Sequence, residues 1–124
     1  MANILVVDDS KFMRKMLSDL LVTEEHRIVG EAENAMEATE LYKQLKPDIV
    51  TLDIIMPEVG GTDAISALKE MVQMDPPAKV VVVSALGQQE VVDQFLEAGA
   101  MEYIAKPFQL CYITDAVERV LQSS

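Results

Sequence analysis

Short apolar runs alternate along this chain with segments in which apolar residues recur every three or four positions. The first pattern is typical of buried strands, and the second is typical of helices with one buried face. Strands are predicted at residues 4–7, 27–31, 49–52, 80–83 and 103–104. Helices are predicted at residues 11–22, 35–45, 62–72, 90–98 and 113–121. Strict alternation of the two kinds of element indicates βα units and a parallel sheet.

Signals at the ends of these segments support the same division. Ser10 and Asn34 are predicted N-caps, since their side-chain oxygens can accept bonds from free N–H groups of the first turn. Gly99 is a predicted C-cap, and Pro57 with the Gly60-Gly61 pair breaks the chain before the third helix. Right-handed crossovers then predict an α/β fold: a flavodoxin-like, doubly wound, five-stranded parallel sheet in the order 2-1-3-4-5, with helices on both faces. Residues 1–124 are expected to form one domain.

Composition limits the partners and the compartment. The 21 acidic residues outnumber the 10 basic ones and give a net charge of -11, so we expect no direct binding of nucleic acid, which depends on Lys and Arg. The one basic stripe (Lys11, Arg14, Lys15) is equally compatible with docking of a phosphodonor and with a solvated helix face. No apolar run is long enough for a membrane span, and no signal peptide is evident. With Cys111 as its single cysteine, the protein is expected in the cytoplasm.

Polar residues follow the predicted strands at their carboxyl ends. Asp8 and Asp9 follow the first strand, Asp53 the third, Ser84 the fourth and Lys106 the fifth. In an open α/β sheet these ends meet at one edge, where ligands bind at the point of reversed winding. Each residue alone could be a turn former, a cap or a surface charge. Their joint placement favours a functional pocket.

Three carboxylates in one cleft repel one another strongly. Two unit charges about 4 Å apart repel by roughly 4 kcal/mol at an effective dielectric constant near 20. Either one carboxyl group is protonated or a cation binds. Oxygen ligands without nearby His or Cys select a hard ion, and Mg²⁺ suits a site with few carboxylates better than Ca²⁺ does.

Four segments in order carry a family resemblance: residues 6–10, residues 53–57 with the glycine pair at 60–61, residues 83–85 and residues 103–107. The whole chain resembles the receiver domain of two-component response regulators. Within that family, residues 84–89 and 106–109 are most similar to the CheY branch of chemotaxis receivers.

The resemblance implies that Asp53 accepts a phosphoryl group from a histidine kinase. Asp8, Asp9 and Asp53 would hold Mg²⁺ together with the backbone carbonyl of Ile55. Lys106 would pair with the phosphoryl oxygens.

The resemblance also implies a switch. Ser84 would move inward to hydrogen-bond the phosphoryl group, and Tyr103 would turn from exposed to buried. A cis bond between Lys106 and Pro107 is implied as well. The expected partners are the sensor histidine kinase, an output protein such as a flagellar switch component, and a phosphatase. The protein would be a monomer that catalyses only its own phosphorylation and dephosphorylation.

Two other functions stay open from the sequence. The chain could be the receiver of a larger regulator with a DNA-binding or enzymatic output. A phosphohydrolase with an Asp nucleophile is disfavoured, because no second acid lies two residues beyond Asp53. Outside the pocket, His26 is expected to be a solvated loop residue and Cys111 to pack in a helix. Ile55 and Leu86 are apolar where many relatives carry polar groups, which predicts slow loss of the phosphoryl group.

Overall fold

The computed structural model describes residues 1–56 and 58–123, and in them strands and helices alternate strictly. The strands are β1 (Asn3–Val7), β2 (Arg27–Ala32), β3 (Ile49–Leu52), β4 (Val80–Ser84) and β5 (Glu102–Ala105). The helices are α1 (Lys11–Thr23), α2 (Ala35–Leu45), α3 (Ala64–Val72), α4 (Gln89–Glu97) and α5 (Leu110–Gln122).

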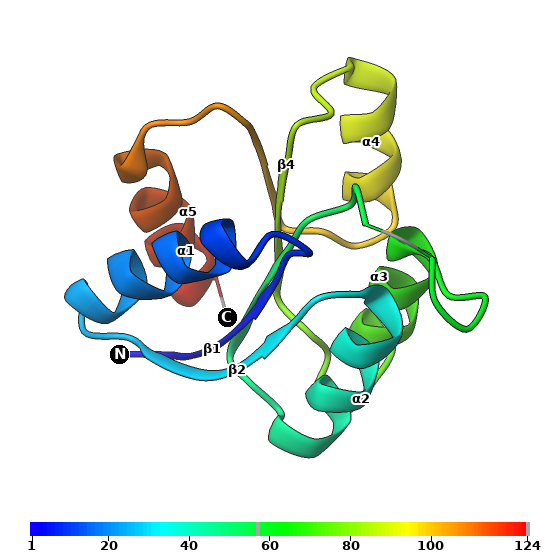
Figure 1. Cartoon of the computed structure of the whole chain (residues 1–124), viewed down its shortest axis with the longest axis horizontal. Helices are drawn as coiled ribbons and strands as arrows, with labels where there is room; N and C mark the ends of the chain where they lie inside the picture. The colour runs from blue at the N-terminus through cyan, green and yellow to red at the C-terminus, as the bar shows by residue number, and fades with distance from the viewer. Residues whose placement is uncertain (57, 124) are drawn as a thin grey trace.

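The five strands form one parallel sheet in the order β2-β1-β3-β4-β5. Helices α1 and α5 cover one face, and α2, α3 and α4 cover the other (Figure 1). This confirms the predicted flavodoxin-like, doubly wound architecture. Because winding starts at β1 and reverses between β1 and β3, the loops after these two strands diverge and leave a site at the edge between them.

The helices on the two faces enclose two separate apolar cores. Ile4 and Val6 of β1 face the core under α1 and α5, whereas Leu5 and Val7 face the core under α2, α3 and α4. Strands β1, β3 and β4 are therefore buried on both faces, which explains why the sequence shows continuous apolar runs rather than alternation. A sheet held from both sides gives a firm base for residues at its carboxyl edge.

The predicted helix ends are largely confirmed. The Ser10 hydroxyl accepts a hydrogen bond from the Met13 N–H at 3.2 Å, and the Asn34 side chain accepts one from the Glu37 N–H at 2.8 Å. Gly99 follows α4 with φ of +120°. Its N–H and that of the next residue bond to carbonyls of the last turn, which is the Schellman pattern that a glycine allows.

Two helix starts differ from prediction. Helix α3 begins at Ala64 instead of residue 62, because the Asp63 carboxylate is the actual cap and accepts the Ser66 N–H at 2.9 Å. Helix α5 begins at Leu110, three residues before the predicted start. Its first turn is exposed, so the apolar spacing of a buried helix face does not extend into it. Pro57, placed by the sequence in the break before α3, lies outside the described residues.

Two expectations about single residues were wrong. His26 is buried, and its Nδ1 accepts the Ala2 N–H at 3.1 Å, so it joins the start of β2 to the start of the chain. Cys111 is exposed in the first turn of α5 and does not pack in the core. Among the helices of residues 1–56 and 58–123, none has the length and apolar character required to span a bilayer.

Candidate functional site

The backbone of the pocket residues continues the ladder of the sheet. The Asp8 N–H donates to the last residue of β2 at 3.0 Å, and the Asp53 N–H donates to the last residue of β1 at 2.9 Å. The Lys106 N–H donates to the last residue of β4 at 2.7 Å. Each side chain is thus placed one residue beyond its strand by a regular hydrogen bond. The sheet positions the pocket more rigidly than free loops would.

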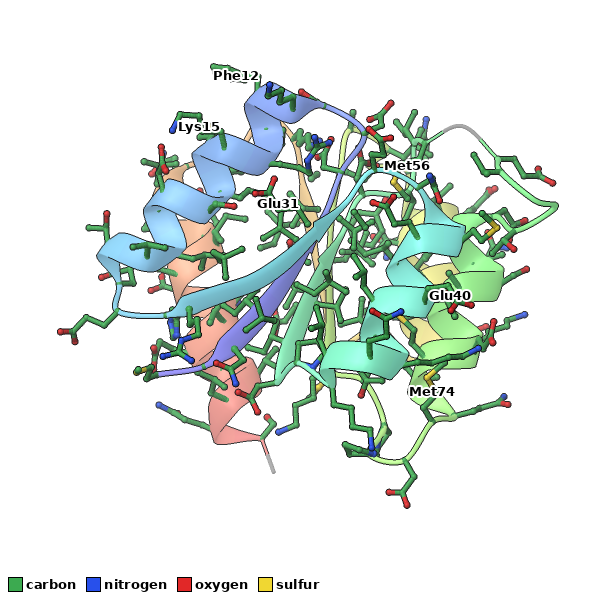
Figure 2. All side chains as sticks on the ribbon, turned by 60° about the horizontal axis from the view of Figure 1, so that its bottom comes forward. Phe12, Lys15, Glu31, Glu40, Met56 and Met74 are labelled. Atoms are coloured by element: carbon green, nitrogen blue, oxygen red, sulfur yellow. The ribbon has the colours of Figure 1, made fainter. Side chains whose placement is uncertain are left out.

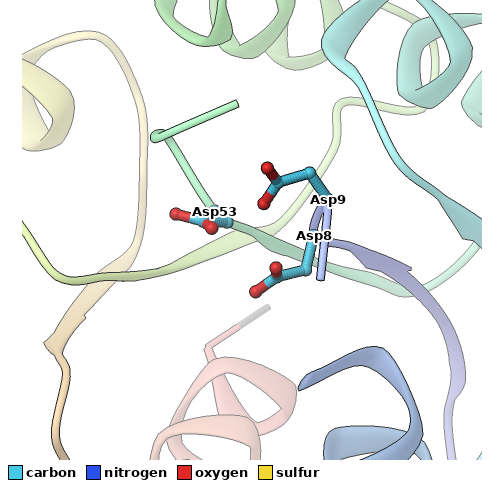
Figure 3. Close-up of side chains that lie close together, drawn as sticks. All are labelled: Asp8, Asp9 and Asp53. Atoms are coloured by element: carbon cyan, nitrogen blue, oxygen red, sulfur yellow. The ribbon is translucent and has the colours of Figure 1, made fainter. Parts of the chain in front are cut away.

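The carboxylates of Asp8, Asp9 and Asp53 point toward one another at the carboxyl edge of β1 and β3 (Figure 3). One oxygen atom of each lies within 4.8 Å of the others. Asp8 and Asp53 are buried, at 1% and 5% exposure, whereas Asp9 is exposed. The structure therefore brings together the three acids that the sequence predicted.

Lys106 lies directly against two of these acids. Its Nζ is 3.0 Å from Asp8 Oδ2 and 3.4 Å from Asp53 Oδ2. The remaining oxygens have backbone donors: Ser10 N–H donates to Asp8 Oδ1 at 2.9 Å, and Ile55 N–H donates to Asp53 Oδ1 at 3.0 Å. The sequence placed Lys106 at this edge of the sheet, and the structure shows that its ammonium bridges the two buried carboxylates. The cis bond between Lys106 and Pro107 that the resemblance implied is present.

Burial raises the pKa of Asp53 above its ordinary value, and the negative charge of Asp8 raises it further. The Ile55 N–H bond and the Lys106 ammonium oppose this rise without cancelling it. One ammonium group thus compensates only part of the charge of three carboxylates. Additional positive charge at the site would favour the ionised form of Asp53.

The donor set fits a hard divalent cation. All the side-chain ligands in the cluster are carboxylate oxygens, and their spacing allows one ion to reach all three. Asp9 is the exposed member, so the cluster is open to solvent on its side. The role of the Ile55 carbonyl as a further ligand stays a prediction.

Ser84 lies at the carboxyl end of β4, and Tyr103 lies on the neighbouring strand β5, where it pairs with Val82. Ser84 ends β4 and is fully buried, with its hydroxyl accepting the Leu86 N–H at 3.3 Å. Within residues 1–56 and 58–123, no hydrogen bond joins Ser84 to the three acids. The half-buried Tyr103 ring packs edge-on against Phe95 with centroids 6.5 Å apart, and its hydroxyl donates to the Leu86 carbonyl. Both residues therefore contact the loop between β4 and α4.

Apolar side chains surround the exposed mouth of the pocket. A cavity of about 480 Å³ is lined by Asp9, Ile54, Ile55, Met56 and Leu86. Ile55 is 47% exposed. A water molecule that enters this cavity would meet mostly apolar side chains, with the Asp9 carboxylate as the polar group of the lining.

Sequence reasoning missed Arg14 as a pocket residue. Arg14 had been grouped with Lys11 and Lys15 as a surface stripe, but its guanidinium turns inward and donates to the backbone carbonyl of Asp8 at 2.7 Å. A signal was available, because the fourth residue after the N-cap Ser10 lies in the first turn of α1, beside the end of β1.

The raised pKa of Asp53 predicts that Asp53→Asn stabilises the metal-free protein at neutral pH. The neutral amide avoids the cost of a buried charge and can still accept the Ile55 N–H. A folded-state pKa above the unfolded one means that the folded state loses stability as pH rises through that window. The advantage of Asp53→Asn should therefore shrink as pH falls from the raised pKa toward the ordinary value of 3.8. Urea unfolding in a chelator, between about pH 7 and about pH 4, measures it.

A control for that comparison is Asp63→Asn. The N-cap carboxylate of Asp63 has a lowered pKa because it accepts hydrogen bonds from Ser66, so its removal should give no gain at neutral pH. Equal stability of wild type and Asp53→Asn at neutral pH would show that the Asp53 carboxylate carries no net burial cost.

Comparison with known proteins agrees with this geometry. The family model described as response regulator receiver domain matches residues 4–118. The chain is 50% identical to the chemotaxis protein CheY of Thermotoga maritima over 94% of this chain and 95% of that protein. It is 47% identical to the CheY of Bacillus subtilis over 95% of this chain and 96% of that protein.

Solved structures show the same fold. A crystal structure of the CheX-CheY-BeF3-Mg+2 complex from Borrelia burgdorferi matches with a TM-score of 0.89 at 36% identity, covering 96% of this chain and 88% of that one. A two-component response regulator of the LuxR family from Aurantimonas matches with a TM-score of 0.91 at 29% identity, covering 99% of this chain and 86% of that one. The chain belongs to the family of response regulator receiver domains.

Proposed function

We propose that this protein is a phosphorylation-dependent signalling switch in which Asp53 accepts a phosphoryl group from a sensor histidine kinase with Mg²⁺ bound at the acidic cluster. The observation that carries the proposal is the convergence of three carboxylates within 4.8 Å, with the Lys106 ammonium against two of them. We propose that residues 1–124 form one receiver domain acting in the cytoplasm, and that its only catalysis is its own phosphorylation and dephosphorylation.

In the proposed reaction an oxygen of the Asp53 carboxylate attacks the phosphorus of the donor. A new O–P bond forms while the P–N bond to the donor imidazole breaks, and its electron pair stays with the imidazole nitrogen. Asp53 must be ionised to attack, although burial raises its pKa. Bound Mg²⁺ supplies the charge neutralisation that such a transfer needs. Asp8, Asp9, Asp53 and the Ile55 carbonyl would hold the ion.

After transfer, the Asp53 oxygen that faced Lys106 belongs to an acyl phosphate. The Lys106 ammonium lies 3.4 Å from Asp53 in the unphosphorylated structure. After transfer it would pair with a phosphoryl oxygen. The Ser84 hydroxyl would leave the Leu86 N–H and donate a hydrogen bond to a second phosphoryl oxygen. Tyr103 bonds to the carbonyl of the same Leu86, so a shift of this loop would free the ring to turn inward and would change the surface of α4 and β5. Differential contacts of this kind are what a two-state switch requires.

The relatives support the choice of partners. The CheY proteins are named for chemotaxis, and the Borrelia protein was solved with CheX, BeF3 and Mg+2. We propose that this receiver acts in chemotaxis as a monomer, with an output protein such as a flagellar switch component and a separate phosphatase. Its net charge of -11 favours protein partners over nucleic acid.

Incubation with acetyl phosphate and Mg²⁺ should add the mass of one phosphoryl group to the wild-type protein. Asp53→Asn should abolish the gain, because an amide oxygen is too weak a nucleophile. Asp19→Asn is the matched control, since Asp19 lies in the exposed part of α1 and pairs with Lys15. Intact-mass analysis measures the result. An equal gain in Asp53→Asn would place the phosphoryl group elsewhere and refute the proposed function.

The apolar mouth predicts that phosphorylated wild type loses its phosphoryl group slowly. The double variant Ile55→Asn, Leu86→Glu introduces groups that can orient water, and we expect its decay to accelerate toward the roughly 100-fold that a positioned proton-transfer group contributes at the low end. Phosphate release from purified phosphoprotein measures the rate.

The matched control for the mouth is the double variant Leu45→Asn, Leu96→Glu. It makes the same two kinds of change at exposed leucines of α2 and α4. Its decay should equal that of wild type. If the mouth variant decays no faster than this control, Ile55 and Leu86 do not limit hydrolysis.

A further inference from the structure

Arg14 points toward the pocket, unlike the other two members of the basic stripe. It lies in the first turn of α1, where its N–H donates to the Ser10 carbonyl at 3.0 Å. Its side chain is only 14% exposed, whereas that of Lys15, the next residue, is 78% exposed and pairs with Asp19. Figure 2 shows Lys15 on the outer side of α1 and Glu31 on the side of the sheet that this helix covers.

Two nitrogens of the Arg14 guanidinium have separate acceptors. Nη1 donates to the backbone carbonyl of Asp8 at 2.7 Å, and Nε donates to Glu31 Oε1 at 3.1 Å. Glu31 belongs to β2, the strand beside β1. The planar group therefore joins α1, β2 and the end of β1. The bond from Nε to Glu31 orients the guanidinium, so that Nη1 points at the Asp8 carbonyl oxygen.

The orientation of the Asp8 carbonyl determines how the backbone enters Asp9. The Asp8 carbonyl and the Asp9 N–H belong to one rigid peptide plane, so a bond to the carbonyl fixes the plane from which Asp9 departs. Asp8 itself is held independently by β2, by Ser10 N–H and by Lys106. Within residues 1–56 and 58–123, no hydrogen bond to the Asp9 carboxylate is present. The position of that carboxylate therefore depends on the backbone at Asp9 and on rotation about the bonds of its own side chain.

We infer that Arg14 is a positioning residue for the metal site: by fixing the Asp8–Asp9 peptide plane, it holds the Asp9 carboxylate within reach of Asp8 and Asp53. This inference rests on the proposed function, since it concerns Mg²⁺ at the same cluster. Arg14 touches neither the ion nor the phosphoryl group. Its effect passes through the backbone.

Lysine would hold the two acceptors in a less fixed geometry than arginine does. A lysine ammonium is a single nitrogen on a flexible stem, whereas the guanidinium offers several donors at fixed angles. In the structure Nε bonds Glu31 while Nη1 of the same planar group bonds the Asp8 carbonyl. Arg14→Lys keeps the charge and loses this fixed geometry, so it separates the two contributions.

Charge and geometry make opposite predictions for removal of Arg14. Loss of a positive charge beside three carboxylates should, by Coulomb attraction alone, tighten the binding of Mg²⁺. Loss of the fixed peptide plane should weaken it, because the Asp9 carboxylate would sample positions outside the cluster. The sign of the change therefore identifies the dominant contribution.

The test is a Mg²⁺ titration of the unphosphorylated protein followed by NMR shifts of the Ile55 and Lys106 amides, which gives the Kd directly. We expect Arg14→Met to weaken Mg²⁺ binding by about 10-fold, the lower end of the 10–100-fold seen when partners that orient ligands are removed. Arg14→Lys should also weaken it, to a smaller extent. Lys15→Met, which removes the same charge one residue away, should not weaken it.

Thermal unfolding in a chelator shows that each variant is folded before titration. Methionine retains an unbranched apolar stem and favours helix, so α1 should persist. Unchanged or tighter binding in Arg14→Met, or Arg14→Lys equal to wild type, would overturn the positioning role while leaving the proposed function intact. Absence of Mg²⁺ binding in wild type would overturn both.

Discussion

The mutual repulsion of Asp8, Asp9 and Asp53 is the constraint on which the rest of the site depends. The sheet holds these carboxylates within 4.8 Å of one another, and two of them are buried. Lys106 offsets part of the repulsion by bridging Asp8 and Asp53. The excess negative charge that remains favours the binding of a divalent cation. A pocket with neutral residues at these positions would have no reason to bind one.

The fold sustains this repulsion because it anchors the two buried acids in a regular ladder. Asp8 and Asp53 extend β1 and β3 by one hydrogen-bonded residue, and these strands are buried on both faces. Separation of the acids would require disruption of the sheet that joins the two apolar cores. The exposed loops carry the adaptable parts instead: Leu86, whose N–H and carbonyl contact Ser84 and Tyr103, lies between β4 and α4. Anchored acids beside a loop that is proposed to shift on phosphorylation would be the physical basis of the switch.

Much of this could be predicted from the sequence, because the signals are local. Continuous apolar runs revealed the buried strands, the caps at Ser10 and Asn34 marked helix starts, and the acids followed directly from where the strands stop. The errors arose where tertiary contacts override local character. His26 stands among charged neighbours, yet the Ala2 N–H and the approach of α5 bury it. The opposite holds at the start of α5, where Cys111 is helical but exposed.

Side-chain direction was the least predictable property of the site. Lys106 could be assigned to the pocket but not to a bridge between two carboxylates. Arg14 could be placed in the first turn of α1 but not given its acceptors, which the exposed Lys15 lacks. Both arrangements depend on contacts between elements distant in the chain. Periodicity within one helix gives the face on which a residue lies and does not give the acceptors that its side chain finds there.

Thermal unfolding of wild type and Asp9→Asn at increasing Mg²⁺, with KCl at matched ionic strength as control, tests the charge crowding most directly. Binding to the folded state alone adds roughly 2.7 kcal/mol of stability at a concentration about 100 times Kd. Wild type should gain several degrees in Tm with Mg²⁺ and little with KCl, and Asp9→Asn should gain much less. Equal Tm values for wild type with and without Mg²⁺ would contradict a cation site built from Asp8, Asp9 and Asp53.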